Sequence, residues 1–334
     1  MTNEIKNRTK LFENGLPTTF GYALEGVVDY NIEDAKTRFM RLKEWDFYQI
    51  TSPEFCMQLT IGHVSYATSV SCTVFEFMSG HRIEMSRMLP FKKVTLDKNA
   101  DEPSEVTYKA DDFEMAFKVK KNFRQLTLRA KDKTYGDVHI DVSMLTKSQA
   151  SVLVSTPFEK PDEFYLNEKI NLMPTSGFAR FGNLDFNFNT KQNFALLDWG
   201  RGVLPFKHEW VWGSGSGLVD GKTFGFNIGI FGNNANGTEN IFYYDDKSYK
   251  LGHVDIYFDK SDYMGKWKFL SDDGSFDFEM TPTYNNYTET KLLFVDNNCH
   301  QVFGKWNGSI TLPSGERVEI RDFFAFCENA HNKW

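Results

Sequence analysis

Short stretches of alternating apolar and polar residues, rich in aromatic and β-branched side chains, run through the first half of the chain. They recur about every ten residues with turn residues between them, which is typical of an antiparallel barrel or sandwich. Helical periodicity is confined to residues 32–45, where we expect no more than one or two turns. The strands predicted in this half lie near residues 45–50, 54–63, 66–79, 81–89, 105–110, 112–120, 123–131, 136–145 and 150–156.

The pattern loosens over residues 158–183, where prolines and glycines precede a new apolar block. We interpret this segment as a domain junction, which divides the chain into residues 1–183 and 184–334. Helices do not alternate with the strands, as a parallel α/β sheet would require, so we predict an all-β chain of two tandem antiparallel barrel domains with very little helix. The strands predicted in the second half lie near residues 184–188, 193–197, 207–217, 222–231, 239–245, 249–259, 266–271, 275–280, 291–295, 300–305, 309–312 and 317–326.

One hairpin can be predicted in its register. Asp220-Gly221, between two apolar runs, indicates a two-residue type I′ turn, because both positions of that turn need positive φ. The opposed pairs that follow from this turn are Val219 with Lys222, Ser214 with Asn227, Trp212 with Gly229, and Trp210 with Phe231.

The alternation sorts this hairpin into two faces. One face is apolar, with Val211, Phe224, Phe226, Ile228 and Ile230. The other carries His208, Trp210, Trp212, Ser214 and Ser216, joined across the hairpin by Gly225, Asn227, Gly229 and Phe231. This second face has the chemistry of a pocket wall, in which a glycine opposite Trp212 leaves room for the ring or for something lying on it. Trp and His on an inward face also fill cores, so core filling and ligand contact both stay open.

Several polar residues near this face are candidates for acid–base chemistry. Glu239, beside Asn240 and before an aromatic run, is the carboxylate that we follow first, because desolvation near indoles raises a carboxyl pKa and makes a general acid. Asp198 and Arg201 precede the hairpin and are either catalytic or an ion pair at a strand end. His208 would relay or accept the proton. The GSGSG run lacks the Lys-[Ser/Thr] and the helix of a phosphate loop.

Composition and motifs exclude several classes of function. The net charge of −7 argues against a nucleic-acid partner and against a basic membrane-surface patch. No segment approaches the roughly 20 apolar residues that cross a bilayer. The polar N-terminus is not a secretory signal, so we expect a cytoplasmic protein. The four cysteines lie far apart, and no HExxH, clustered His/Cys or GxSxG motif occurs, so we expect no metal and no cofactor.

The segments DWGRGVLPFKHEWVWGSGSG, GFNIGIF and GTEN, in this order, resemble the bacterial family known as domain of unknown function 2804. RLKEWDFYQI (41–50) and residues 155–182 and 308–329 extend the resemblance over nearly the whole chain. The family looks like a distant relative of tandem lipocalin-like proteins such as carotenoid hydratases and tocopherol cyclase. The resemblance implies two lipocalin-like, calycin-type β-barrels, with a pocket in or between them.

In the hydratases, His, Trp, Tyr and Asp residues near the second barrel are thought to protonate an isoprenoid double bond. His208 and Trp210 are similar to the His-x-Trp pair of that group, whereas Tyr243 and Asp245 share only the spacing of its Tyr-x-Asp pair.

Three functions are therefore considered. The first is a binding module that holds a hydrophobic or aromatic small molecule, with Trp210, Trp212, Asn227, Phe231 and Asn240 as contacts. The second is a cofactor-independent hydratase, cyclase or isomerase, with Asp198 or Glu239 as proton donor and indoles that stabilise developing positive charge. The third is carbohydrate processing, which needs two carboxylates at a separation that the sequence does not define.

Overall fold

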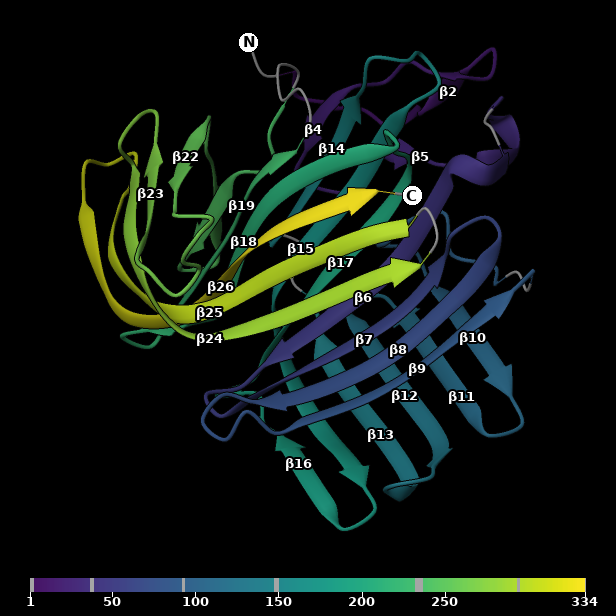
Figure 1. The fold of residues 1–334 in the computed structure, drawn as a ribbon. Helices are drawn as coiled ribbons and strands as arrows, with labels where there is room; N and C mark the ends of the chain where they lie inside the picture. Colours follow the sequence, from purple (N-terminus) through teal and green to yellow (C-terminus); the bar gives the residue numbers. More distant parts are fainter. Residues whose placement is uncertain are drawn as a thin grey trace.

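The computed structural model describes residues 3–36, 39–91, 94–146, 150–231, 237–292 and 295–333. In this part of the chain nearly every element is a strand (Figure 1). The helical turns expected within residues 32–45 are confirmed as two 3-10 turns, η1 (Ile32–Asp34) and η2 (Phe39–Arg41). Two small sheets lie near the N-terminus, one of β1 (Thr9–Lys10) and β5 (Val28–Asp29), the other of β2 (Phe12–Glu13) and β3 (Leu16–Pro17).

The first large sheet has 13 strands within the described residues, and its main path runs β10-β11-β12-β13-β15-β17-β6-β7-β8-β9. Pairing along this path is antiparallel throughout. The strands are β4 (Gly21–Ala23), β6 (Leu42–Thr51), β7 (Phe55–His63), β8 (Ala67–Glu76), β9 (Arg82–Pro90), β10 (Ser104–Ala110), β11 (Phe113–Lys120), β12 (Phe123–Asp132), β13 (Gly136–Leu145), β14 (Ser151–Pro157), β15 (Phe164–Phe181), β16 (Leu184–Phe188) and β17 (Phe194–Val203).

The second large sheet has nine strands in the described ranges, in the order β21-β20-β19-β18-β26-β25-β24-β23-β22. Its strands are β18 (Lys207–Val219), β19 (Lys222–Phe231), β20 (Ile241–Tyr244), β21 (Lys247–Lys250), β22 (Val254–Tyr257), β23 (Trp267–Ser271), β24 (Phe276–Leu292), β25 (Val295–Thr311) and β26 (Arg317–Lys333). The expected all-β class is confirmed: two curled, antiparallel, lipocalin-like sheets stand in tandem (Figure 1).

In two places the structure joins strands that the sequence pattern predicted as separate. The sequence indicated separate short strands in the ranges now covered by β24 and β25, each of which is a single strand of 17 residues. The polar run between Thr281 and Thr290 resembles a turn in composition, yet it stays paired with β25 across a register shift at Pro282/Tyr284. A bulge bends a strand without ending it, which explains the difference.

The segment interpreted as a domain junction is mostly one long strand, β15. It has a register shift between Ile170 and Met173, where Leu172 has a φ of 53°, so its one proline and one glycine accompany a bent strand instead of a linker. Sheet membership changes later, between Val203 of β17 and Lys207 of β18. If the domains are defined by their sheets, the division belongs at residues 204–206, and the boundary at 183 stays a prediction.

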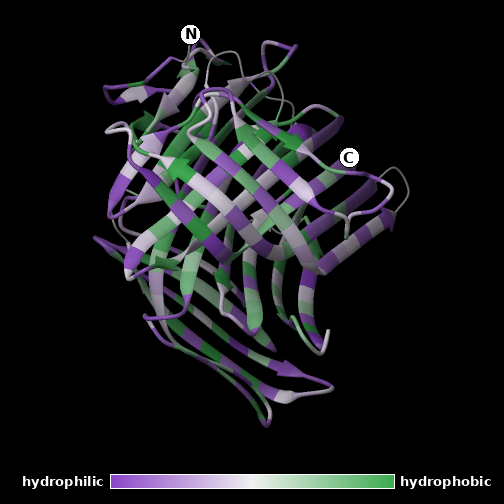
Figure 2. Cartoon of the chain, turned by 90° about the vertical axis from the view of Figure 1, so that its left-hand side faces the viewer, coloured by the Kyte–Doolittle hydropathy of each residue, from purple (hydrophilic) through white to green (hydrophobic). Residues whose placement is uncertain are grey.

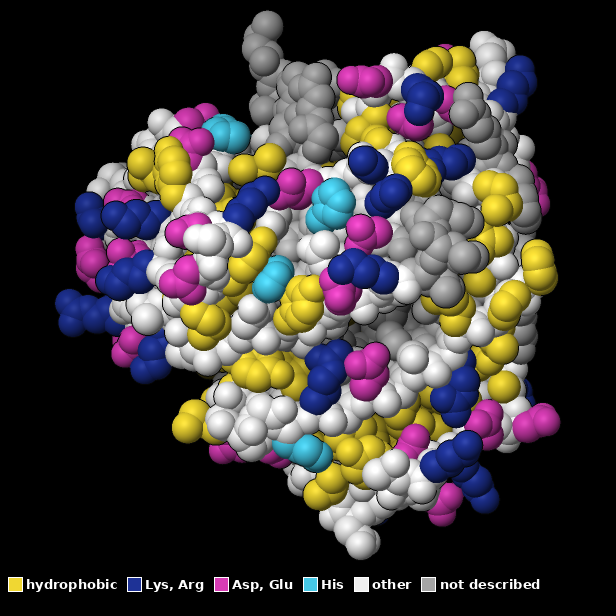
Figure 3. Space-filling view, in the orientation of Figure 1, with side chains coloured by type: hydrophobic (Ala, Val, Ile, Leu, Met, Phe, Trp, Pro, Cys, Tyr) yellow, Lys and Arg dark blue, Asp and Glu magenta, His cyan; other side chains and the backbone are white. Residues whose placement is uncertain are grey.

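Each sheet buries its own apolar core, and further aromatic residues pack where the two sheets meet. Hydrophobic and hydrophilic bands alternate along the strands, as a half-buried sheet requires (Figure 2). At the junction of the sheets, Phe75 of β8 lies 5.5 Å from Phe303 of β25, measured between ring centroids. On the face shown in Figure 3, basic and acidic side chains are interspersed without a large patch of one sign.

Candidate functional site

The predicted hairpin is confirmed in its register. Trp210 pairs with Phe231, Trp212 with Gly229, and Ser214 with Asn227 across β18 and β19. The turn residues Asp220 and Gly221 have φ values of 50° and 80°, as a type I′ turn requires.

The two faces of the hairpin are also as predicted, but the indole face has different surroundings. Phe224, Phe226 and Ile228 belong to the core of the second sheet. Trp212, on the opposite face, packs with Phe75 and Leu196 of the first sheet. The indole face therefore points away from the interior of its own sheet and toward the other sheet.

A cavity of about 320 Å³ lies at this junction. Side chains of β6, β7, β15 and β17 line it from the first sheet, and side chains of β18, β19, β24, β25 and β26 line it from the second. Its aromatic lining consists of Trp45, Phe47, Tyr165, Trp210, Trp212 and Phe231. Its charged lining consists of Lys169, Asp198, Glu239 and Glu328. The pocket that the resemblance placed in or between the barrels is thus between them.

Lys169 joins two of the predicted carboxylates. It is paired directly with Asp198 in the register of β15 and β17, and its Nζ lies 2.5 Å from Asp198 Oδ1. The same Nζ lies 4.0 Å from Glu239 Oε2 and 4.3 Å from the centroid of the Trp212 ring. Asp198 Oδ2 accepts a hydrogen bond of 3.0 Å from Trp45 Nε1. Asp198 and Glu239 therefore converge on one buried ammonium group, which the sequence analysis did not identify.

Glu328 is a second residue that the sequence analysis missed. It is 7% exposed, and its carboxyl oxygens accept hydrogen bonds from Trp210 Nε1 at 2.8 Å and from Gln301 Nε2 at 3.1 Å. Burial raises the pKa of Glu328 to about 7. Burial also raises the pKa of Glu239. The cavity thus contains one carboxyl group, that of Glu328, that can hold a proton near neutral pH, beside the Asp198 carboxyl group that is paired with Lys169.

The two predicted asparagines support the wall of the cavity from behind. Trp212 Nε1 donates to Asn227 Oδ1 at 2.7 Å, and Asn227 Nδ2 donates to the Glu239 carbonyl at 3.0 Å. Asn240 accepts from the backbone of Gly229 at 2.7 Å. Neither asparagine is among the residues that line the cavity. Their amides position Trp212 and the segment that carries Glu239.

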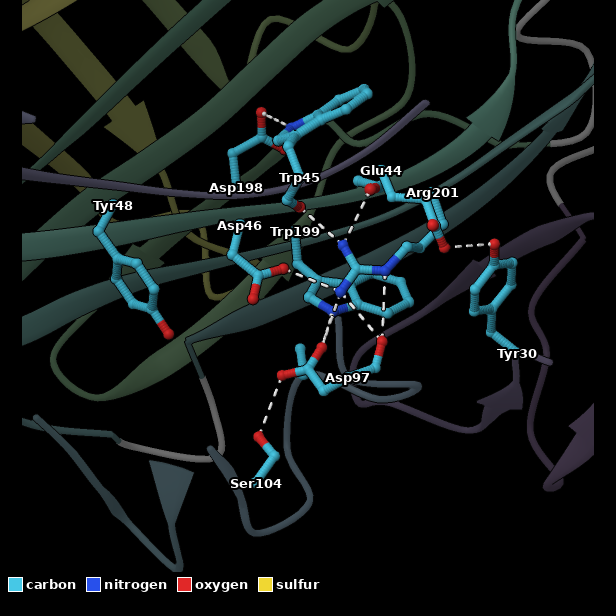
Figure 4. A network of polar contacts seen from close by, with 12 residues as sticks. Tyr30, Glu44, Trp45, Asp46, Tyr48, Asp97, Ser104, Asp198, Trp199 and Arg201 are labelled. Carbon is cyan, nitrogen blue, oxygen red and sulfur yellow. Dashed lines mark hydrogen bonds and ion pairs between the residues drawn. The ribbon is translucent and has the colours of Figure 1, made fainter. Parts of the chain in front are cut away.

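Arg201 lies in a separate network on the other side of β17 (Figure 4). Its Nη2 lies 2.8 Å from both Asp46 Oδ1 and Asp97 Oδ1, and its guanidinium stacks 4.1 Å above the Trp199 ring. The ion pair between Asp198 and Arg201 that the sequence analysis considered does not form. Because β17 continues through both positions, their spacing of three residues places the two side chains on opposite faces.

His208 lies behind Trp210 and is not among the residues lining the cavity. Its ring stacks on that of Trp210, with centroids 5.6 Å apart and an interplanar angle of 17°. His208 Nδ1 lies 2.8 Å from the Pro205 carbonyl, which assigns the proton of a neutral ring to Nδ1. Burial lowers the pKa of His208 to about 4, so the ring is neutral at pH 7. The geometry gives His208 a packing contact with the wall of the cavity.

The remaining candidates from the sequence lie away from the cavity. Tyr243 is buried in a separate apolar cluster, and Asp245 is exposed at a turn, where it pairs with Lys222 at 3.1 Å. No helix in the described part of the chain is long and apolar enough to cross a membrane.

Comparison with known proteins places the chain by its fold and family. The crystal structure of kievitone hydratase from Nectria haematococca aligns with a TM-score of 0.52 at 10% identity, covering 87% of this chain and 88% of that one. A protein from Nitrosomonas europaea designated AttH aligns with a TM-score of 0.48 at 12% identity, covering 87% and 92%. The likeness to kievitone hydratase shows the fold alone. No curated protein matches the sequence. Residues 2–334 match the model described as domain of unknown function (DUF2804), and the chain belongs to that family.

Proposed function

We propose that this protein binds one small lipophilic or aromatic molecule in the cavity between its two sheets. The observation that carries this proposal is the set of six aromatic side chains around a space of about 320 Å³. This volume lies at the lower end of the range typical of small-molecule sites. Aromatic rings supply large contact areas at low entropic cost, and the few polar groups would fix the orientation of the ligand.

The chemistry of the lining supports an apolar ligand body over a sugar. Three of the indole N–H groups, those of Trp45, Trp210 and Trp212, are already used in hydrogen bonds to the protein. Their ring surfaces are left for apolar or π contact. We therefore do not propose carbohydrate processing.

A variant that fills the cavity tests this proposal. Thr60 of β7 lines the cavity and is half-buried, so T60W would occupy the ligand's space. Thr127 of β12 is also half-buried and lies outside the cavity, which makes T127W the matched control. We expect native mass spectrometry, after exposure of the protein to a cell extract, to show a retained small molecule with wild type and T127W and none with T60W. Equal capture by all three proteins would overturn the proposal.

Acid–base catalysis on the bound molecule is a second candidate function. It is favoured by a contrast among the carboxyl groups of the cavity. Burial raises the pKa values of Glu328 and Glu239, whereas Asp198 is paired with the ammonium group of Lys169. The kievitone hydratase with a similar fold is in keeping with this candidate. We expect E239Q to retain ligand capture and to lose any change that the wild type causes in the metabolite profile of an extract. A wild-type profile that matches the profile without protein would rule out this candidate in that extract.

A further inference from the structure

The lining of the cavity has more acidic than basic side chains. Asp198, Glu239 and Glu328 line it, and Lys169 is the one Lys or Arg among the described residues that line it. Lys169 is already held by Asp198 at 2.5 Å, with Glu239 next at 4.0 Å. The carboxyl oxygens of Glu328 receive hydrogen bonds from an indole and an amide, which are both neutral donors. Glu328 is therefore a carboxyl group of the cavity without a cation in contact.

Tyr165 lies close to all three of these carboxyl groups. It is 7% exposed and lines the cavity, and its hydroxyl makes no hydrogen bond within the described residues. Burial, followed by the charges of three nearby carboxyl groups, raises the pKa of Tyr165 well above its ordinary value. A tyrosine presents both an aromatic ring and a polar hydroxyl to a cavity that it lines, so Tyr165 offers a bound molecule an aromatic surface and a hydrogen-bonding oxygen.

The aromatic rings beside Glu328 enclose a corner. Phe231 stands nearly perpendicular to Trp210, at 84° with centroids 6.0 Å apart, and perpendicular to Tyr165, at 90° and 5.2 Å. One face of Trp210 is covered by the neutral ring of His208. Organic cations bind over the faces of aromatic rings, and clusters of aromatic side chains form the cages that hold quaternary ammonium ligands.

The protein already contains one such arrangement on the same wall. The Lys169 ammonium lies 4.3 Å from the Trp212 ring centroid and 2.5 Å from the Asp198 carboxylate, so an indole and a carboxylate together hold a cation. Trp210, two residues before Trp212 in β18, and Glu328 form a second pair of indole and carboxylate. No cation of the described chain is paired with Glu328 there.

We infer that the ligand is an organic cation, whose ammonium group lies among Tyr165, Trp210 and Phe231 with Glu328 as its counter-ion. This inference rests on the proposed binding function and defines its ligand class. An apolar body would extend along the remaining aromatic lining. A carboxylate ligand is disfavoured, because the ammonium of Lys169 is already paired and the other charged groups of the lining are acidic.

This counter-ion role predicts a dependence of binding on pH. The groups that face Glu328 are Trp210 from β18, Gln301 and Cys299 from β25, Lys169 from β15 and Asp198 from β17. The pKa of Glu328 is about 7 in the free protein, and a bound cation favours its ionised form. Affinity for a cation should therefore rise with pH up to about 7 and stay level above it, whereas affinity for a neutral molecule should not change.

Three matched probes test the inference: benzyltrimethylammonium, its uncharged isostere neopentylbenzene, and the anion phenylacetate. We expect tryptophan fluorescence titration at pH 7.5 to show the cation binding at least about tenfold more tightly than the isostere, and the anion most weakly. E328Q should lose most of this preference and keep its affinity for the isostere. E319Q, which alters an exposed carboxylate outside the cavity, should keep the wild-type preference.

The wild-type protein provides a test that is independent of whether E328Q folds. Between pH 5.5 and 7, the affinity for the cation should fall by up to about tenfold for each unit of pH lowered, and the affinity for the isostere should stay constant. An isostere that binds as tightly as the cation would overturn the inference and leave the proposed binding function intact. Failure of all three probes would overturn it as well, and equal capture by wild type and T60W would instead remove the binding function itself.

Discussion

Gly229 and Glu239 are structurally dependent on one another. A Cβ atom added to residue 229 would lie 2.1 Å from Glu239 Oε1 and 3.0 Å from its Cδ. Gly229 is paired with Trp212 across the hairpin, and the sequence analysis expected it to leave room for the indole or for a ligand. The space is taken instead by the carboxyl group of Glu239, which is thereby held against the cavity.

The first prediction concerns G229A. An alanine methyl group at this position must displace Glu239, because the backbone of Gly229 is held by its pairing with Trp212 and by the hydrogen bond that it donates to Asn240. We expect the free energy of unfolding to fall by about 1–3 kcal/mol, the usual cost of overpacking. Urea denaturation at pH 7.5 would measure this loss.

The double variant G229A/E239A separates this clash from a general cost of alanine in β19. In the E239A background the methyl group meets none of the three atoms that lie nearest to it, which all belong to Glu239. G229A should then cost less than about 0.5 kcal/mol, because the two substitutions are coupled. Equal costs in both backgrounds would show that the contact is not the cause.

The second prediction concerns the buried ion pair of Lys169 and Asp198, whose side chains are 5% and 12% exposed. K169M removes the ammonium and leaves Asp198 with a hydrogen bond from Trp45. Loss of one partner of a buried pair typically costs about 3–5 kcal/mol, because the remaining charge is left uncompensated. We expect K169M to lower the urea midpoint strongly and the double variant K169M/D198N to recover part of the loss. Additive effects would indicate that the pair is not coupled.

The hairpin could be predicted from the sequence because its determinants are local. Positive φ at Asp220 and Gly221 fixes the turn, and the turn fixes every pair above it. Alternation then assigns the faces, and the Trp212 face was correctly separated from the Phe226 face. Alternation does not show which part of the protein a strand face packs against. The sequence therefore could not distinguish a cavity between the two sheets from a cavity inside one barrel.

The residues that complete the site come from distant strands. Lys169 is in a segment that was interpreted as a junction, and Glu328 follows an apolar run at the other end of the sequence. Their convergence depends on the packing of the two sheets, which no short-range pattern encodes. The separation of Asp198 from Arg201 is different, because strand parity would have revealed it had the strand been extended beyond residue 197.

The third prediction is that Arg201 stabilises the fold without contacting the ligand. Its guanidinium donates to the Trp45 carbonyl at 2.7 Å and to Asp46 and Asp97 at 2.8 Å, and the side chain is fully buried. Lysine keeps the charge but not this planar set of donors, so R201K should lower the free energy of unfolding by about 2–4 kcal/mol. The affinity of the folded protein for a cavity probe should change less than about twofold. A large change in affinity with unchanged stability would place Arg201 in the binding site instead.

The fourth prediction concerns the dependence of stability on pH through His208. Its pKa is about 4 in the folded protein and about 6.5 in an unfolded chain, so folding favours the neutral ring. The stabilisation is complete above pH 6.5 and is lost as the pH falls from there through 4, by at most about 3 kcal/mol. Asparagine can keep the hydrogen bond to Pro205 without titrating, so H208N should lose less stability than the wild type between pH 6.5 and 4. The contribution of Glu328 to the pH dependence has the opposite sign, but it is present in both proteins and cancels in the difference between them.

Chemical denaturation at steps of half a pH unit would measure this difference. H253N, which alters an exposed histidine, is the control that should keep the wild-type profile. Parallel profiles for H208N and wild type would contradict a neutral, buried His208.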